Sequence, residues 1–283
     1  MRGKRKTMRW DSRFKSDPPD LLLYDWVVVN SSSGKDSQSV LAEVVREAKK
    51  QRFSSSRIVV GHCDLSPVEW PGTKELARLQ AEHYKLRFEV RRNNKENMLE
   101  RILRRRMWPS SACRFCTSDF KRGPSGTLMT ALGRELHQKC PGIGRPVRIL
   151  SCLGMRAEES PAREKLAKYG PIVRLSNTRK QVDMWLPIYK WTVEQVWEDI
   201  KATGVPHHVA YDLGMPRLSC VFCIFSPRAA LLLAGKHNPE LLDRYVEIER
   251  EIKHTFKNGF RIEEIKEALK AGEVPGKIQN WVM

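Results

Sequence analysis

Short apolar runs alternate with amphipathic stretches along the first part of the chain. The first run, from Tyr24 to Val29, is rich in β-branched residues and bounded by polar ones, which is typical of a buried parallel strand. Apolar residues then recur at helical spacing from Val40 to Ala48 and predict a helix. The alternation continues, and we expect strands at 57–60, 88–90 and 147–152 and helices at 74–84, 95–107 and 193–203. This pattern predicts an α/β fold with a Rossmann-like, doubly wound, mostly parallel sheet.

The chain divides into three parts. Residues 1–23 form a basic arm that we expect to be flexible, and residues 24–226 carry every chemical motif. Residues 227–283 are amphipathic and predict a helical C-terminal extension. No apolar run approaches the roughly 20 residues of a membrane span, and the basic start does not lead into an apolar signal segment. We therefore expect no membrane association and a reducing, cytoplasmic compartment.

Positive charge is concentrated in two segments. The 283 residues include 51 Lys and Arg and 33 Asp and Glu, for a formal net charge of +18. Residues 1–16 hold seven basic residues and one acid, and residues 85–148 hold sixteen basic residues and five acids. Such patches favour a nucleic-acid partner, and solubility plus a small anionic nucleotide is the alternative. On the first interpretation, charge reversal at Arg104, Arg105 and Arg106 should weaken nucleic-acid binding and spare ATP.

The segment Ser31-Ser32-Ser33-Gly34-Lys35-Asp36-Ser37 lies between the first strand and the first helix. A turn at this place aims backbone N–H groups and the positive end of a helix dipole at one point, where a phosphate group is favoured. It is not a Walker A loop, because Asp36 follows Lys35 and position 29 is not Gly. A serine-rich helix cap is the alternative, but it does not explain the order Gly-Lys-Asp-Ser.

These seven residues resemble the PP-loop, SGGxDS, with Ser33 at the usual first Gly. Two further segments match in the expected order: Gly61-His62-Cys63-Asp64, and Gly154 to Ser160 followed by Arg163. Over roughly residues 24–226 the chain thus resembles the phosphoadenosine phosphosulfate (PAPS) reductase and DndC-like family of the PP-loop ATP-pyrophosphatase superfamily, which has the adenine nucleotide alpha hydrolase-like fold. The resemblance implies ATP or PAPS with Mg²⁺ and catalytic roles for Lys35 and Asp36. It implies nucleotide contacts from Ser31, Ser32, Ser33, Gly34, Lys35, Asp36, Ser37, Asp64, Arg156 and Arg163.

Four of the seven cysteines form two CxxC pairs, Cys113 with Cys116 and Cys220 with Cys223. Chance supplies about 0.15 such pairs in a chain of this composition. Two residues between thiols let one turn present both sulfurs to a single metal, and four thiolates complete a [4Fe–4S] cluster or a tetrahedral Zn²⁺ site. The family resemblance implies the iron–sulfur cluster, with Zn²⁺ and a redox disulfide as alternatives. Cys63 is a candidate sulfur-handling thiol or a packed core residue.

The resemblance leaves several activities open. Reductases of the family are expected to use a nucleophilic Cys near the C-terminus, and no Cys follows Cys223 in this sequence. We therefore expect a DndC-like or tRNA-thiolase-like enzyme that cleaves ATP to AMP and pyrophosphate. This would activate an acceptor, DNA or tRNA, for sulfur transfer from a donor such as a cysteine desulfurase. One alternative is a sulfonucleotide reductase that releases sulfite. The other is a nucleotide-sensing or nucleic-acid-binding module without turnover.

Overall fold

A six-stranded sheet with the order β3-β2-β1-β4-β6-β5 organises the computed structural model, which describes residues 18–279 and 281. The strands are β1 (Trp26–Ser31), β2 (Ile58–Cys63), β3 (Arg87–Arg91), β4 (Val147–Cys152), β5 (Tyr169–Pro171) and β6 (Lys180–Trp185). Neighbouring strands pair in parallel except for β5, which is antiparallel to β6. The expected mostly parallel sheet is therefore confirmed. The strand order reverses between β1 and β4, so the switch point of the fold lies beyond Ser31 and Cys152.

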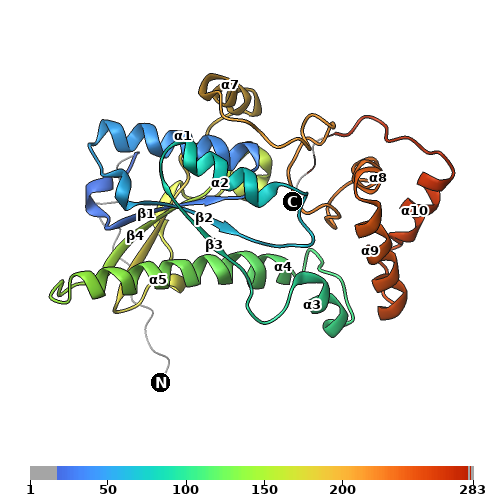
Figure 1. Cartoon of the computed structure of the whole chain (residues 1–283), viewed down its shortest axis with the longest axis horizontal. Coiled ribbons are helices and arrows are strands. Elements are labelled where there is room, and N and C mark those ends of the chain that lie inside the picture. Colours follow the sequence, from blue (N-terminus) through green and yellow to red (C-terminus); the bar gives the residue numbers. More distant parts are fainter. Residues whose placement is uncertain (1–17, 280, 282–283) are drawn as a thin grey trace.

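Helices cover both faces of this sheet (Figure 1). One face carries α1 (Lys35–Lys50), α2 (Thr73–His83) and α7 (Val193–Thr203), and the other carries α5 (Gly123–Lys139). The side chains of β1 alternate between the two resulting cores. Val27 and Val29 pack towards α1, whereas Trp26 and Val28 pack towards α5. A parallel sheet that is covered by helices on both faces requires strands with apolar side chains on both faces.

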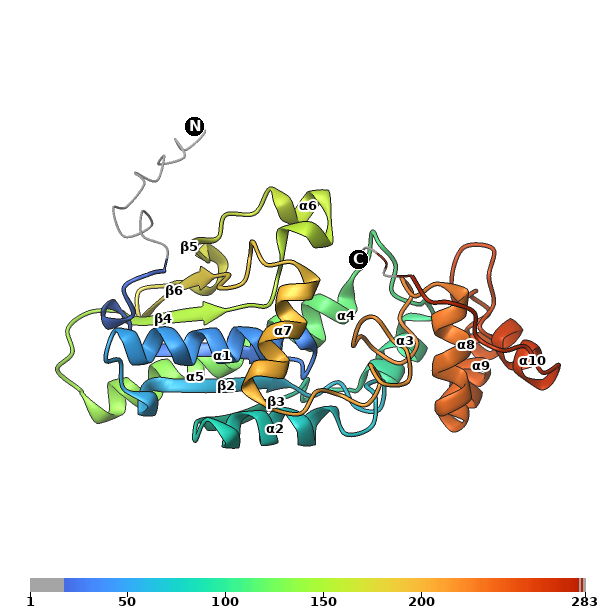
Figure 2. The ribbon, with the colours of Figure 1, turned by 90° about the horizontal axis from the view of Figure 1, so that it is seen from above.

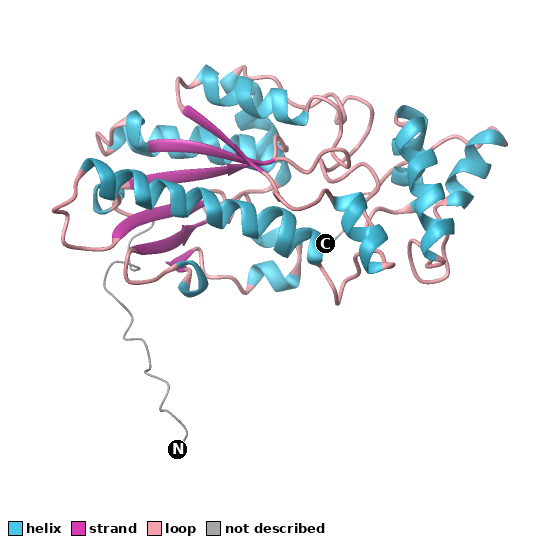
Figure 3. Cartoon of the chain, turned by 60° about the horizontal axis from the view of Figure 1, so that its bottom comes forward, coloured by secondary structure: helices cyan, strands magenta, loops and turns pink. Residues whose placement is uncertain are grey.

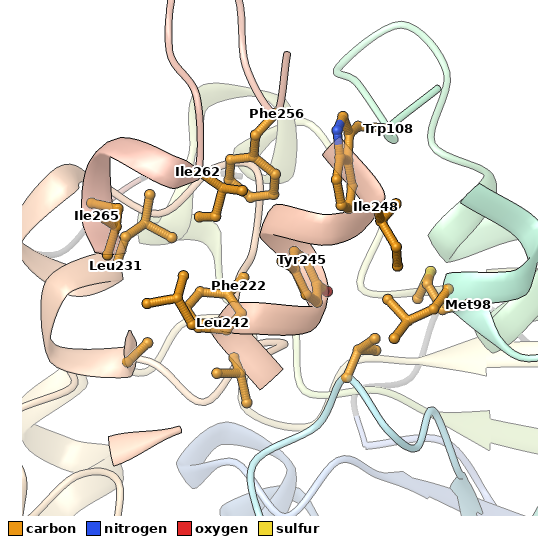
Figure 4. Close-up of a cluster of buried hydrophobic side chains, with 14 of the residues drawn as sticks. Met98, Trp108, Phe222, Leu231, Leu242, Tyr245, Ile248, Phe256, Ile262 and Ile265 are labelled. Carbon is orange, nitrogen blue, oxygen red and sulfur yellow. The ribbon is translucent and has the colours of Figure 1, made fainter. Parts of the chain in front are cut away.

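The helical C-terminal part shares a core with residues far away in the sequence. It consists of α8 (Arg228–His237), α9 (Pro239–Ile252) and α10 (Glu263–Lys270), which group beside α3 (Met98–Arg105) at one end of the molecule (Figures 2 and 3). Within this core Trp108 stacks on Tyr245, with ring centroids 5.1 Å apart, and meets Phe256 edge-on (Figure 4). Trp108 Nε1 donates to the carbonyl oxygen of His254 at 3.0 Å. The C-terminal helices thus hold the segment that contains the first CxxC pair.

Several short elements connect the larger ones. A single helical turn, α4 (Phe115–Thr117), leads through a π-helical turn, η4 (Ser118–Arg122), into α5. The remaining ones are η2 (Leu21–Leu23), η3 (Ser55–Arg57), η5 (Ala157–Glu159), α6 (Pro161–Glu164) and η6 (Val173–Leu175). π-Helical turns are rare and occur mostly at functional sites, and η4 directly follows Cys116.

The expected elements are present, and several others were not predicted. β4 and α7 have the expected bounds, and the other expected elements differ by a few residues at their ends. The sequence pattern did not predict α5, β5 and β6, nor the short helices α4 and α6 and the η turns. Residues 1–17 of the expected flexible arm lie outside the described residues, whereas residues 18–23 include η2, whose Leu21 is buried in the core beside α1. Within the described part of the chain, no helix is long and apolar enough to cross a bilayer.

Candidate functional site

The loop from Ser31 to Ser37 is closed by its own hydroxyl groups. Ser37 Oγ accepts a hydrogen bond from Ser32 N at 3.1 Å and donates one to the Gly34 carbonyl at 2.9 Å. Ser31 Oγ accepts from Ser33 N at 3.3 Å. Gly34 is the N-cap of α1, so the first turn of that helix begins inside the loop. The loop therefore presents the positive end of the α1 dipole at the switch point of the sheet.

Ser33 has a left-handed backbone, with φ of 58°. This is the position at which the PP-loop pattern has Gly, and Gly adopts such angles without the cost that a Cβ incurs. The Ser33 side chain is fully buried, and its hydroxyl donates to the carbonyl oxygen of Thr73 at the start of α2. The loop thus retains the glycine-like conformation, and the hydroxyl ties it to the neighbouring helix.

Replacement of Ser33 by Gly should destabilise the protein less than replacement by Ala. Both variants lose the bond to Thr73, but Ala keeps the strained φ, so the Ala variant should be less stable by about 1 kcal/mol. Urea denaturation measures the difference. Ser54, with φ of −67°, is the control position, because there Gly should be the more destabilising replacement. A Ser33→Gly variant that is less stable than Ser33→Ala would contradict this account of the loop.

The backbone of the loop is in close contact with Gly154, the first residue after Leu153. A Cβ at Gly154 would lie 2.9 Å from the Asp36 carbonyl carbon and 3.0 Å from Ser37 N. Both are backbone atoms at the start of α1 and cannot rotate away. Gly at this position therefore allows the segment after β4 to pack directly on the phosphate loop.

Arg156, two residues further on, forms an ion pair with the loop. Its Nε donates to Asp36 Oδ1 at 2.6 Å, and its guanidinium also contacts Glu158 and the Trp191 carbonyl. Lys35 Nζ lies 3.4 Å from Asp36 Oδ2. Only 1% of Arg156 is exposed, so it is a buried residue, although it also pairs with the neighbouring Glu158. The structure thus brings Lys35, Asp36 and Arg156 together.

Glu159 joins two more cations to this cluster. Its carboxylate accepts a hydrogen bond from Arg163 and one from Arg217 Nη2 at 2.7 Å. The same carboxylate accepts from the backbone N–H of Arg156 at 2.9 Å. We call Lys35, Asp36, Arg156, Glu159, Arg163 and Arg217 the loop cluster.

Positive charge exceeds negative charge within the loop cluster. Burial lowers the pKa of Lys35, and the charges of Arg217 and Arg156 lower it further. Burial and Arg217 lower the pKa of Arg163 to about 10. Burial alone would raise the pKa of the Asp36 carboxyl, but the charges of Lys35 and Arg156 hold it below its ordinary value. An anion bound here would offset this repulsion among the cations.

A C-terminal segment covers the loop cluster. The hydroxyl of Tyr211 accepts from the backbone N–H of Lys35 at 2.8 Å, and Lys35 Nζ donates to the Pro216 carbonyl at 3.1 Å. Arg217 Nη1 donates to the carbonyl oxygen of Trp281 at 2.9 Å. The segment around residues 211–217 thus encloses the start of α1, and residue 281 reaches the same arginine.

Asp64 lines a different cavity. It follows β2, and its carboxylate accepts from the backbone N–H of Ser66 at 2.9 Å. The cavity is polar, with a volume of about 290 Å³, and is lined by Asp64, Arg92, Lys95 and Phe120 among others. Burial would raise the pKa of Asp64, but hydrogen bonds to Ser66 lower it. Among the described residues no hydrogen bond or ion pair joins Asp64 to the loop cluster, so the structure does not join this predicted nucleotide contact to the others.

Three of the four paired cysteines lie close enough to influence one another. Burial raises the pKa of Cys220 to about 12, and the thiols of Cys223 and Cys116 raise it further while Lys121 lowers it. The fourth thiol, Cys113, contacts Arg105 Nη2 at 3.7 Å. All four cysteines have free thiols, a donor set that fits iron–sulfur or zinc binding. In the described part of the chain, however, no three ligand side chains already have metal-binding geometry.

The cysteines adjoin the loop cluster through Arg217. Arg217 donates to Glu159 of the loop cluster and precedes Cys220 by three residues. The second pair is anchored by the bridge between Glu69 and Cys220 and by a bond from Val221 N to the Val68 carbonyl at 2.9 Å. Arg217 thus links the loop cluster to the second cysteine pair along the chain.

Sequence reasoning missed Tyr211, Glu159 and Arg217. Glu159 lies within the recognised segment from Gly154 to Ser160, but the resemblance assigned no role to it. Arg217 and Tyr211 precede the second CxxC pair without a recognisable spacing. A basic residue three positions before a cysteine pair was the only available signal for Arg217.

Residues 26–226 match the family described as phosphoadenosine phosphosulfate reductase domain. An uncharacterised 37.8 kDa protein from the gpa 5' region of Escherichia phage 186 is 26% identical over 148 residues, which cover 51% of this chain and 41% of that protein. The chain therefore aligns with less than half of this relative's length.

Solved structures with a similar fold have low sequence identity to the chain. PAPS reductase from Candida auris, as a phosphate complex, is 15% identical with a TM-score of 0.42, and the match covers 71% of this chain and 83% of that one. FMN adenylyltransferase from Candida glabrata, with FAD and pyrophosphate, is 13% identical with a TM-score of 0.43 and coverage of 71% and 58%. The U34-tRNA thiolase NcsA from Methanococcus maripaludis, with its [4Fe–4S] cluster, is 13% identical with a TM-score of 0.39 and coverage of 91% and 75%.

Proposed function

The chain belongs to the phosphoadenosine phosphosulfate reductase domain family, and from this membership we propose an ATP-using enzyme of its DndC-like branch. The enzyme binds ATP at the Ser31–Ser37 loop and cleaves it to AMP and pyrophosphate. The cleavage activates an acceptor, a nucleic acid, for sulfur transfer.

The observation that carries this proposal is the loop cluster at the start of α1. Four buried or half-buried cations, Lys35, Arg156, Arg163 and Arg217, converge there on two carboxylates. Guanidinium groups bind phosphate oxygens in a bidentate manner, and a helix N-terminus adds its dipole. A polyphosphate at this place would offset the excess positive charge of these four cations.

The chemistry requires the bond between the α-phosphorus and the oxygen that bridges to the β-phosphorus to break. An acceptor oxygen attacks the α-phosphorus, and pyrophosphate leaves with the electron pair of that bond. Lys35 and the cluster arginines stabilise the charge that develops on the departing pyrophosphate. The sulfur donor, a cysteine desulfurase being one candidate, carries a persulfide, whose outer sulfur attacks the activated carbon or phosphorus of the acceptor as AMP leaves with the oxygen. An external dithiol then cleaves the sulfur–sulfur bond by forming a disulfide with the donor sulfur, and the other sulfur stays on the acceptor. Asp36 would hold Mg²⁺ together with the phosphate oxygens, and the metal would offset their charge.

The two CxxC pairs are the proposed ligands of a [4Fe–4S] cluster. Cys113, Cys116, Cys220 and Cys223 would hold it, with Zn²⁺ as the alternative metal, and an iron–sulfur cluster would supply a thiophilic centre beside the activated acceptor. The short separation in sequence between Arg217 of the loop cluster and Cys220 supports this position for sulfur chemistry. Metal analysis of anaerobically purified protein distinguishes iron from zinc.

A sulfonucleotide reductase would need a nucleophilic thiolate at the loop cluster. Cys63 is the cysteine next to a predicted nucleotide contact, but its Sγ donates to the Lys121 carbonyl at 3.3 Å. Burial raises the pKa of Cys63 to about 11. A thiol with this pKa is protonated near neutral pH and is a poor nucleophile. This favours ATP cleavage over attack by Cys63 on the sulfate group of PAPS.

Incubation of the full chain with labelled ATP, and separately with PAPS, tests the proposal. AMP and pyrophosphate from ATP, formed in the presence of a nucleic acid, are the expected products. Sulfite from PAPS would instead establish a reductase. Tight ATP binding without products, with every acceptor supplied, would assign the chain a sensing or binding role.

A further inference from the structure

A second group of cations surrounds a cavity away from the loop cluster. The cavity, of about 420 Å³, lies between α5 and residues 174–180. Lys180 is 8% exposed and its Nζ donates to Thr130 Oγ1 at 2.7 Å, while Arg134 and Arg174 are exposed at the rim. We call this the α5 pocket. Lys180 begins β6, whereas the loop cluster lies beyond the carboxyl ends of the strands, so the two sites are separated by about the length of a strand, ~20 Å.

The α5 pocket has no negative charge to balance these cations. Residues 121–134 and 172–181, which line it, contain no Asp or Glu. Burial and the charge of Arg134 lower the pKa of Lys180, and burial and the charge of Arg122 lower that of Arg174. A lysine buried with only hydroxyls and like charges around it is costly unless an anion compensates it.

Elsewhere in the basic 85–148 segment, acids neutralise many of the cations. The ion pairs there are Arg87 with Glu135, Arg91 with Glu89, Arg101 with Asp119, Arg104 with Glu96, and Lys139 with Glu135. Arg106 donates to the Glu251 carbonyl, and Arg105 contacts the Cys113 thiol. The arginines at 104–106 thus have partners within the chain, and they are weaker candidates for a nucleic-acid contact than the sequence indicated. The cations around the α5 pocket remain without acidic partners among the described residues.

We propose that the α5 pocket holds a backbone phosphate of the nucleic-acid acceptor; this rests on the proposed function for the identity of the acceptor. The hydroxyls of Thr127, Thr130 and Ser176 line the cavity with the three cations. Each hydroxyl already donates to a backbone carbonyl, so the three cations supply the donors for phosphate oxygens. The pocket has no aromatic residue in its lining to stack a base, which disfavours a mononucleotide. Exposed arginines at the rim suit a strand that continues past the pocket, because phosphate contacts position a nucleic acid without reading its sequence.

A double charge reversal, Arg134→Glu with Arg174→Glu, tests the α5 pocket. Both side chains are exposed, so the fold should be kept, and thermal melting checks this. Binding of a fluorescein-labelled single-stranded oligonucleotide should weaken roughly tenfold or more at about 0.1 M salt, and the slope of log affinity against log salt should decrease by about 1 to 2. The control is Lys49→Glu with Arg52→Glu, which changes the net charge equally at the far end of α1 and should weaken binding much less.

Two results would overturn the assignment. One is equal loss of oligonucleotide affinity in the pocket and control variants, because the effect would then come from net charge alone. The other is unchanged oligonucleotide affinity in the pocket variant. If that variant also loses binding of inorganic phosphate, the α5 pocket is a site for small anions. ATP cleavage measured on the same preparations keeps the two proposals separate. If ATP is not cleaved but the pocket variant binds the oligonucleotide more weakly, only the proposed function is contradicted. If ATP is cleaved but the pocket variant binds the oligonucleotide normally, only this site is contradicted.

Discussion

Replacement of Lys35 by Ala should abolish most ATP cleavage, with a fall in turnover of roughly 10²- to 10³-fold. Lys35 Nζ lies within the loop cluster, 3.4 Å from Asp36, and the side chain is 3% exposed. A preorganised cation in such an enclosed place stabilises charge on the departing pyrophosphate far more than it would in water, and losses of this size follow removal of one such group. Release of AMP and pyrophosphate from labelled ATP measures the effect.

The matched control for Lys35 is Lys49, an exposed lysine at the other end of α1. Lys49→Ala should leave both ATP binding and turnover within about twofold of the unaltered protein, as surface substitutions away from a site usually do. Lys35→Met keeps the apolar stem in place and guards against a loss that merely reflects unfolding. If the Lys35 variants bind and cleave ATP normally, the nucleotide site proposed at this loop is wrong.

The parts of the fold that could be predicted from sequence are those whose signals are local. The run at Tyr24 to Val29 is apolar on both faces, and Thr192 with Gln195 forms a capping box that marks the start of α7. The phosphate loop was recognisable because its residues are consecutive. In each case the residues that determine the structure lie within a few positions of one another.

β6 and α5 escaped prediction because their patterns are interrupted by residues with distant partners. In β6, Lys180 and Asp183 are buried polar residues, and Tyr24 OH donates to Asp183 Oδ2 at 2.8 Å. The first turn of α5 contains Gly123 and Pro124, which usually indicate a loop. Only the tertiary structure shows the contacts that compensate for these residues. A prediction from hydrophobic periodicity alone therefore finds neither the strand nor the helix.

Only those residues of the candidate site that belong to a recognisable sequence motif could be predicted. Lys35, Asp36, Arg156 and Arg163 belong to recognisable segments, and the structure brings them together. Arg217 comes from a segment that crosses the loop, and no local pattern determines that crossing. Asp64 also follows a recognisable strand, but the strand order directs it into a neighbouring cavity.

Replacement of Gly154 by Ala should disrupt the loop cluster without changing any charged residue. The new Cβ would lie 2.9 Å from a backbone carbon of Asp36, a distance that real Cβ atoms essentially never show, so β4's exit or the start of α1 must shift. Overpacking of this kind costs about 1 to 3 kcal/mol of unfolding free energy. Since a displacement of about 1 Å in a catalytic array can cost roughly 10²-fold, ATP turnover should fall by a similar factor.

Gly170→Ala is the control for this substitution, because an added Cβ there meets nothing within 4 Å. Urea denaturation and ATP turnover should both remain close to those of the unaltered protein in the control. A Gly154→Ala variant that matches the control in both measurements would refute the close packing of the two segments. If Gly154→Ala loses stability but keeps its turnover, the packing exists and does not position the cations. Loss of both, with Gly170→Ala intact, ties the phosphate loop to the arginine segment as one catalytic unit.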